Sequence, residues 1–192
     1  MLRRRCASVA ALLFATAASS LAIAADTFKV DPVHSSVIFK IAHFDTANFY
    51  GRFGRIEGSV TSEGDKPTAL EVKVEADSID TNNADRDKHL RGPDFFDTKQ
   101  YPDITFKSTA VKPGADDKSF EVTGDLNLHG TAKPITVKLT KIGQGQNVKG
   151  TPIVGYEATF TVKRSEFGMS GYINKGIGDE VTLTVSLEAV KQ

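Results

Sequence analysis

The sequence predicts an all-β protein whose strands close into a barrel or pack as two sheets. Apolar and polar residues alternate along most segments beyond Asp26, which is typical of antiparallel strands with one buried face. Clusters of Gly, Pro, Asn and Asp separate these segments, and long helical patterns are few. Because each such strand buries one face and an open sheet leaves exposed edges, the strands require a barrel or a sandwich.

The alternating segments predict eight or nine strands in chain order. The expected strands cover residues 28–30, 33–44, 51–61, 70–77, 104–107, 120–128, 135–140, 156–163 and 181–189. A barrel of about eight strands has an interior just wide enough for side chains or for one small ligand. The strand pattern therefore leaves a ligand cavity open as one of two outcomes.

The second strand is the most informative. Its bulkier face carries Val37, Phe39 and Ile41 and ends at His43, which suggests an apolar interior with a polar group near its opening. An ordinary core strand would show the same pattern.

The alternation breaks between residues 78 and 103. The segment NNADRDKHLRG predicts a short helix capped by Asn82 or Asn83, and the next segment places Phe95 and Phe96 in a turn. The segments 113–117 and 143–147, rich in Gly and polar residues, are expected to be hairpin turns.

The first 24 residues predict a secretory signal peptide. They carry Arg3, Arg4 and Arg5, no acidic residue, and an apolar run that ends in small residues. A transmembrane anchor is the weaker alternative, because the run is short and rich in alanine. We therefore expect a signal peptide over residues 1–24, one soluble domain over residues 25–192, and a periplasmic or secreted protein.

Cys6, the single cysteine, falls inside the predicted signal peptide, so no disulfide or cysteine metal site is expected in the mature protein. Removing the leader's three arginines from 24 basic residues leaves 21, against 24 acidic residues. Nucleic-acid binding, which usually requires a basic surface, is not expected.

The histidines are the candidates for a metal site or a general base. No HExxH or GxSxG pattern is present, and the four histidines are not spaced as compact ligand sets, so we predict no catalytic residue, no metal and no cofactor. His34 is expected to hold the first long strand in place, and His129 to lie in an exposed turn. His43 and His89 stay open between structural roles and ligand contact.

Aromatic residues gather in the expected connections, around residues 44–53, 95–96 and 167–173. Loops rarely carry this much apolar surface without covering or lining something. These rings either plug the ends of a barrel or line the opening of a pocket.

The residues also resemble the YceI family of lipid-binding proteins. The resemblance covers nearly the whole mature chain and is carried by DPVHSSVIFKIAHF, GRF followed by Glu57-Gly58, HLRGPDFFD, YPDITFKST, VTGDLNLHGTAKPITV and RSEFGM. It implies a lipocalin-like antiparallel β-barrel of about eight strands with a short helical insertion. It also implies a long apolar cavity for a polyisoprenoid or similar lipid, and no catalysis.

Family members differ in two loops, which here read DTANFY and MSGYIN, so ligand length and head group stay open. The positions that match residues shared in the family are His34, Ser35, Phe39, His43, Gly51, Phe53, Gly58, His89, Leu90, Phe95, Phe96, Pro102, Phe106, Gly124, Leu126, Gly130, Arg164, Phe167 and Gly168.

Set beside the strand pattern, the resemblance gives a concrete hypothesis for the ligand site. The expected lumen residues are Val37, Phe39, Ile41, Phe53, Val72, Val74, Phe106, Leu126 and Phe160. The residues expected to close the opening are Phe95, Phe96, Phe167 and Met169. The polar head group of the lipid is expected to meet His43, His89 and Arg164.

The expected partner is a long-chain lipid, and a homodimer stays open. Two other function classes are also open: a hydrolase or isomerase acting on a small apolar substrate with His43 or His89 as general base, and a module whose loop aromatics dock another envelope protein.

Overall fold

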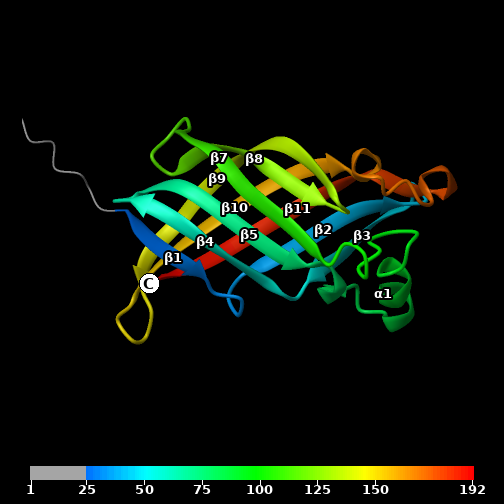
Figure 1. The fold of residues 1–192 in the computed structure, drawn as a ribbon, viewed down its shortest axis with the longest axis horizontal. Helices are drawn as coiled ribbons and strands as arrows, with labels where there is room; N and C mark the ends of the chain where they lie inside the picture. Colours follow the sequence, from blue (N-terminus) through cyan, green and yellow to red (C-terminus); the bar gives the residue numbers. More distant parts are fainter. Residues whose placement is uncertain (1–24) are drawn as a thin grey trace, which may run out of the picture.

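The computed structural model describes residues 25–192, so the predicted signal peptide over residues 1–24 lies outside the described residues. One antiparallel sheet closes on itself, because β1 (Asp26–Val30) pairs with β4 (Ile56–Glu63) on one side and with β11 (Ile177–Lys191) on the other. The eight strands of the closed ring follow the order β1, β4, β5, β7, β8, β9, β10 and β11. The predicted barrel is confirmed (Figure 1).

The remaining strands of the ring are long and run from one end of the barrel to the other (Figure 1). They are β5 (Lys66–Glu75), β7 (Asp103–Pro113), β8 (Ser119–Leu128), β9 (Thr131–Gln146) and β10 (Pro152–Lys163).

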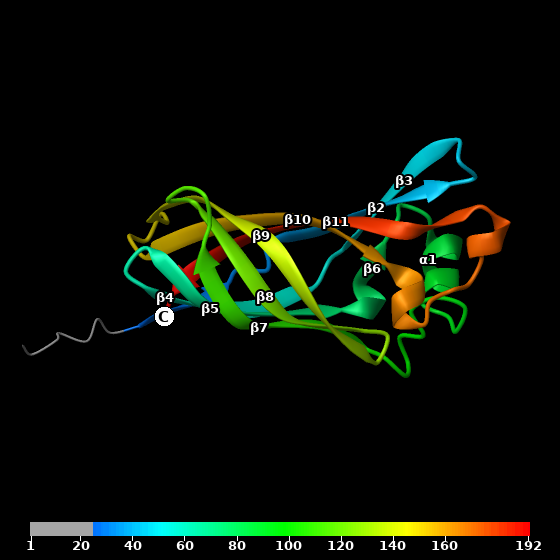
Figure 2. The ribbon, with the colours of Figure 1, turned by 90° about the horizontal axis from the view of Figure 1, so that it is seen from above.

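Strand β11 changes partners along its length. Its last residues pair with β1, whereas residues 177–186 pair with β2 (Ser36–His43). The sheet continues from β2 to β3 (Ala47–Phe53) and to the short β6 (Ile79–Asp80). The β2–β3 hairpin projects from the end of the barrel that also carries the helix (Figure 2).

The predicted helix is α1 (Ala84–Leu90). Asn83 is its N-cap, and its side-chain Oδ1 accepts a hydrogen bond from the backbone N–H of Arg86 at 3.0 Å. Three single-turn 3₁₀ helices, η1 (Ala76–Ser78), η2 (Arg164–Phe167) and η3 (Ile173–Lys175), complete the structure of the described residues.

The structure corrects the strand predicted over residues 51–61. This segment holds the end of β3 and most of β4, which are separated at Gly54 and Arg55. Phe53 and Ile56 are both buried, at 5% and 4% exposure. Residues three apart on one strand point to opposite faces, so the chain must break for both to enter the core. This division and the short β6, which was not predicted, give the sheet eleven strands rather than eight or nine.

The hairpin turn predicted over residues 143–147 lies further along the chain. Strand β9 continues to Gln146, and it stays paired with β10 on both sides of a bulge in which Ile142 of β9 is the extra residue opposite Gly155 and Tyr156. The turn begins at Asn147, whose side-chain Oδ1 accepts hydrogen bonds from the backbone N–H groups of Lys149 and Thr151, both at 3.0 Å.

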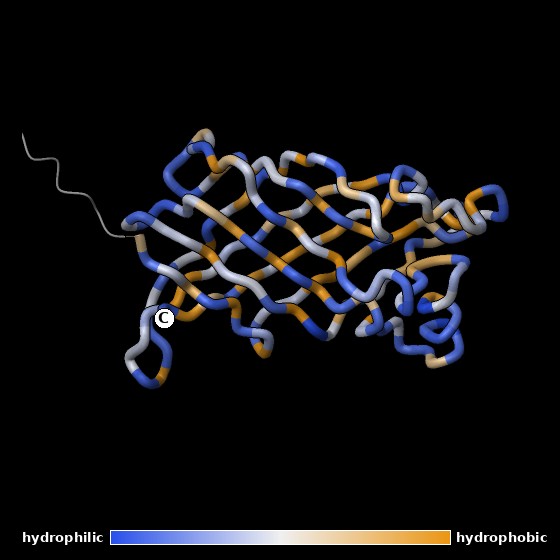
Figure 3. The backbone as a smooth tube through the Cα atoms, viewed as in Figure 1, coloured by the Kyte–Doolittle hydropathy of each residue, from blue (hydrophilic) through white to orange (hydrophobic). Residues whose placement is uncertain are grey.

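Apolar and polar residues alternate along the strands of the barrel wall (Figure 3). On β2, Val37 and Phe39 are buried, whereas Ile38 between them is 42% exposed, as the strand pattern predicted. Gly51 lies opposite Phe39 on β3, and a Cβ atom there would collide with the Phe39 ring. The absence of a side chain at Gly51 therefore leaves space in the lumen for the Phe39 ring.

Candidate functional site

The barrel interior contains an apolar cavity that we call the mouth chamber, with a volume of about 390 Å³. Its lining includes residues of α1 and of the β2–β3 hairpin, which lie at the same end of the barrel (Figure 2). The predicted site residues that line it are Phe39, Ile41, His43, Phe53, His89, Phe95, Phe96, Leu126, Phe160, Arg164 and Met169.

A second cavity, the deep chamber, continues the lumen toward the other end of the barrel. Its volume is about 100 Å³, and Ile104, Leu126, Phe160 and Leu183 line both chambers. The predicted site residues found only in the deep chamber are Val37, Val72, Val74 and Phe106. The two chambers are thus consecutive parts of one apolar lumen.

Phe167 is the predicted site residue that the structure places outside the lining of both chambers. It is only 2% exposed and packs with Leu128 and Val162 in a core cluster. Its backbone carbonyl accepts a hydrogen bond from Nδ1 of His129 at 3.2 Å. The position of Phe167 is that of a core residue that supports the wall, rather than of a residue that closes the opening.

An aromatic group, which we call the mouth cluster, borders the mouth chamber and consists of His89, Phe95 and Tyr172. The rings of Phe95 and Tyr172 stack at 5.5 Å between centroids, and the His89 ring meets both edge-on at 5.1 and 5.6 Å. His89 Nε2 also lies 3.2 Å from Oδ2 of Asp94. The cluster joins α1 and the loop directly after it to the loop between η2 and β11, and it gives the opening both apolar and polar groups.

Arg164 lines the mouth chamber but is already bonded to the protein. It is 4% exposed, and its guanidinium donates to the backbone carbonyls of Gly178 and Met169 at 2.8 and 2.7 Å, and of Gly171 and Ile177 at 2.7 and 3.2 Å. Burial lowers the pKa of Arg164. With most donors engaged, Arg164 holds the loop between η2 and β11, and its predicted head-group role has little support.

Arg86 and Phe49 are site residues that were absent from the predicted set. The Arg86 guanidinium lies 4.3 Å from the centre of the Phe49 ring, and both residues line the mouth chamber. Its Nε also donates to Oγ1 of Thr81 at 2.8 Å. Arg86 is three residues before His89 on the predicted helix, a spacing that puts both on one face and could have identified it.

The predicted set also lacked lining residues from the strands, from the end of α1 and from the loop before β11. They are Leu70, Leu90, Ile104, Thr105, Val122, Leu128, Ile135, Val137, Leu139, Ala158, Val162, Tyr172, Ile177, Val181, Leu183, Val185 and Leu187.

Two of the four histidines lie at the opening, one in a turn and one on the outer wall. His43, at the end of β2, lines the mouth chamber and contacts the Phe44 ring edge-on at 4.4 Å, and His89 lies in the mouth cluster. His129 lies in the β8–β9 turn and is half-buried, with its ring 4.4 Å from that of Tyr101. It is therefore less exposed than predicted.

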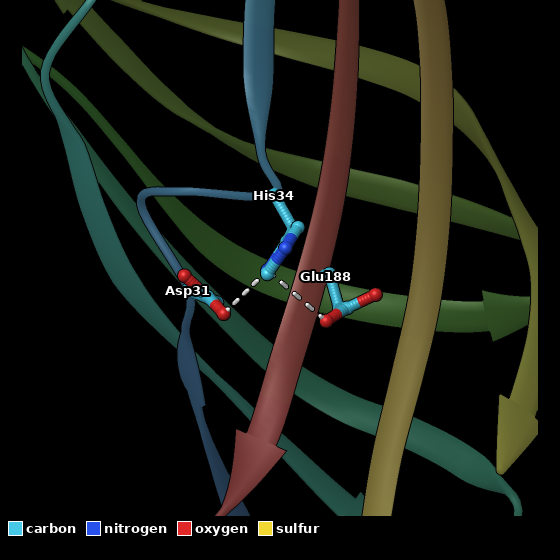
Figure 4. Close-up of side chains that lie close together, drawn as sticks. All are labelled: Asp31, His34 and Glu188. Atoms are coloured by element: carbon cyan, nitrogen blue, oxygen red, sulfur yellow. Dashed lines mark hydrogen bonds and ion pairs between the residues drawn. The ribbon is translucent and has the colours of Figure 1, made fainter. Parts of the chain in front are cut away.

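His34 lies outside the lumen, where its Nδ1 is 2.8 Å from Oδ2 of Asp31 and 3.6 Å from Oε1 of Glu188 (Figure 4). The hydrogen bond with Asp31 raises the pKa of His34 and, in turn, lowers the pKa of Asp31. These contacts tie the loop before β2 to β11, as predicted for His34.

Among residues 25–192, none of the helices has the length and apolar character needed to cross a membrane.

Comparison with known proteins identifies relatives along most of the chain. The YceI-like domain family matches residues 28–189. Protein YceI of Escherichia coli O17:K52:H18 is 39% identical over 175 residues, which cover 89% of this chain and 90% of that protein.

Solved structures show the same fold. BcnA of Burkholderia cenocepacia superimposes with a TM-score of 0.74 at 25% identity, over 83% of this chain and 99% of that one. A polyisoprenoid-binding domain from Saccharophagus degradans gives a TM-score of 0.70 at 16% identity, over 86% of this chain and 98% of that one, and this likeness concerns the fold alone. The family match, the sequence identity and the shared barrel agree, and the chain belongs to the YceI-like family.

Proposed function

We propose that this protein is a carrier or storage protein that holds a polyisoprenoid or a similar long apolar lipid in its lumen. The observation that carries the proposal is the continuous apolar lumen formed by the mouth and deep chambers. Cavities of about 300 to 1,000 Å³ lined by apolar and aromatic side chains are typical of small-molecule sites. The S. degradans domain, which shares the fold, is described as polyisoprenoid-binding, and we propose the same class of ligand here.

The binding energy comes from burial of the lipid chain. Each methylene removed from water contributes about 0.8 kcal/mol, so a long tail needs few polar contacts. The tail lies along Phe39, Leu126 and Phe160 and reaches Val72 and Val74 in the deep chamber. The lipid enters with its tail first, because the polar groups lie at the opening.

The head group stays at the opening, where His43 and His89 supply ring nitrogens and Arg86 supplies a cation. A polar head left without partners there would cost about 1 to 3 kcal/mol. Arg164 keeps its structural role, since its guanidinium is bonded to backbone carbonyls.

We propose a periplasmic or secreted location, which rests on the signal-peptide pattern of residues 1–24. Fractionation of cells that express the full chain tests this. Processed protein in the periplasmic fraction supports it, and unprocessed protein in the cytoplasm contradicts it.

The ligand is tested by extracting the protein, purified without detergent, with organic solvent and analysing the extract by mass spectrometry. A stoichiometric isoprenoid or other long-chain lipid supports the carrier. Repeated absence of any lipid from native preparations contradicts it, and turnover of an added ester or isoprenoid would favour the enzyme alternative.

A matched pair of variants separates lumen binding from adhesion to the outer surface. Leu183→Trp places an indole where the two chambers meet, and Thr184→Trp places the same ring on the outer wall of the same strand. We expect Leu183→Trp to lose the co-purified lipid and Thr184→Trp to retain it. Equal retention by both variants would mean that the lipid binds elsewhere.

A further inference from the structure

Three side chains that can bind a metal ion meet on the outer wall of the barrel. Asp31 and His34 come from the loop between β1 and β2, and Glu188 comes from β11 (Figure 4). Each offers one ligand atom, and these atoms all lie within 4.8 Å of one another. The group lies where β11 exchanges β2 for β1 as its partner.

Backbone hydrogen bonds hold the group in place. The N–H of Asp31 donates to the carbonyl of Glu188 at 2.8 Å, and the N–H of Glu188 donates to Oγ of Ser35 at 3.1 Å. Oδ1 of Asp31 accepts from the N–H of Val33 at 2.8 Å, which turns Oδ2 toward His34. The loop and the strand therefore present their ligand atoms on a fixed frame, as a preorganised metal site requires.

The distances and the chemistry fit zinc. Zinc binds histidine nitrogen and carboxylate oxygen at about 2.0 to 2.2 Å, so two ligand atoms of a tetrahedral site lie roughly 3.3 Å apart. The Nδ1 atom of His34 lies 2.8 Å from Asp31 Oδ2 and 3.6 Å from Glu188 Oε1. Rotation of the Glu188 side chain, which is 34% exposed, can bring its oxygen closer.

We propose that Asp31, His34 and Glu188 bind one zinc ion, with a water molecule as the fourth ligand. His34 is 62% exposed, which leaves room for that water. On binding, Nδ1 of His34 gives up its proton to solvent and donates its lone pair to the ion, and Nε2 carries the remaining ring proton. The ion replaces the Asp31–His34 hydrogen bond.

The ion would connect the β1–β2 loop to β11 at the point where β11 changes its pairing partner from β2 to β1. Metal that binds the folded state stabilises it by mass action. This inference is independent of the lipid proposal, because the three residues lie outside the lining of both chambers.

The test is a titration of the purified, chelator-treated protein with ZnCl₂, followed by calorimetry and by thermal unfolding. We expect one ion per chain and a higher melting temperature. His34→Ala and Glu188→Gln each weaken zinc binding at least tenfold. The control is Glu180→Gln, the same substitution on the same strand at an exposed position, which leaves zinc affinity unchanged.

A second readout keeps the proposal testable if His34→Ala folds poorly. Cobalt added in place of zinc gives a visible absorption band for a tetrahedral nitrogen and oxygen site, and Glu188→Gln should remove it. Three results would overturn the proposal: no saturable zinc binding, equal affinity in wild type and Glu188→Gln, or equal stabilisation by Mg²⁺, which prefers octahedral oxygen sites.

Discussion

The two chambers of the lumen are built from different parts of the chain. The deep chamber is lined entirely by strand residues, almost all of them aliphatic or aromatic. The mouth chamber adds side chains from α1, from the loop after it and from the loop between η2 and β11. Strand number and side-chain alternation determine the deep chamber, whereas loops determine what the opening recognises. For the lipid carrier proposed above, this division would separate the binding of the tail from the choice of the head group.

The largest effect is expected from the arginine that holds the mouth loop. Replacing Arg164 by Met leaves backbone carbonyls without donors and should lower the free energy of unfolding by about 3 kcal/mol. We expect faster hydrogen exchange in residues 169–178 and little change in the strands that line the deep chamber.

The control for this variant is Arg52→Met, which removes an exposed ion pair with Asp80 and should cost under about 1 kcal/mol. Chemical denaturation measures both variants. Equal stability of Arg164→Met and wild type would show that the carbonyl network does not hold the loop.

The deep chamber can be filled without touching the mouth. Ala158→Phe adds a ring to this chamber, and Thr159→Phe adds one to the outer wall at the neighbouring position. Overpacking should cost Ala158→Phe about 2 kcal/mol. The lipid that it retains should be shorter, as measured by mass spectrometry of the co-purified ligand. An unchanged chain length would place the tail outside the deep chamber.

The mouth can be loosened without changing the deep chamber. Phe95→Ala removes the ring that stacks on Tyr172, a contact of about 1 kcal/mol. We expect a fluorescent lipid to dissociate about fivefold faster, with the same preference for chain length. Tyr50→Ala, an exposed residue outside the lining of both chambers, is the control and should leave the dissociation rate unchanged.

The smallest effect concerns pH. The carboxylate of Asp179 accepts hydrogen bonds from the backbone N–H and the hydroxyl of Ser165 at 2.9 and 2.8 Å, and these bonds lower its pKa. A pKa that is lower in the folded state stabilises the fold above the ordinary aspartate pKa of about 3.9, and this contribution is lost as the pH falls below that value.

Thermal unfolding between pH 3 and pH 7 tests this contribution. Asp179→Asn should narrow the difference in melting temperature between the two ends of that range. An identical pH dependence in the variant and wild type would contradict it.

The deep chamber could be predicted from sequence because the pattern that defines it, the alternation of apolar and polar residues along each strand, is local. The alternation around Val37 on β2 and around Val72 and Val74 on β5 places these side chains on one face of each strand, and closure of the barrel turns that face inward. The mouth chamber was harder to predict from sequence, because its contacts join segments that are far apart in the chain. No pattern near Tyr172 shows that it stacks on Phe95, and nothing local distinguishes the buried Phe167 from the lining residue Met169.

The role of Arg164 was equally hard to predict from sequence, because it depends on which hydrogen bonds the guanidinium makes. An arginine beside an apolar cavity suggests a partner for a polar head group, and the sequence does not show that its donors are engaged. The engagement of these donors becomes visible only from the path of the backbone over residues 169–178, whose carbonyls accept hydrogen bonds from the guanidinium.

The partners of Arg164 have a consequence for how this protein can evolve. Every hydrogen-bonding partner found for it among the described residues is a main-chain carbonyl, which all amino acids possess. Most substitutions in that loop therefore leave its anchor intact. Replacement of the Tyr172 side chain would change the groups at the opening and leave these carbonyls in place. A lineage could change the lipid that it selects while the barrel remains the same.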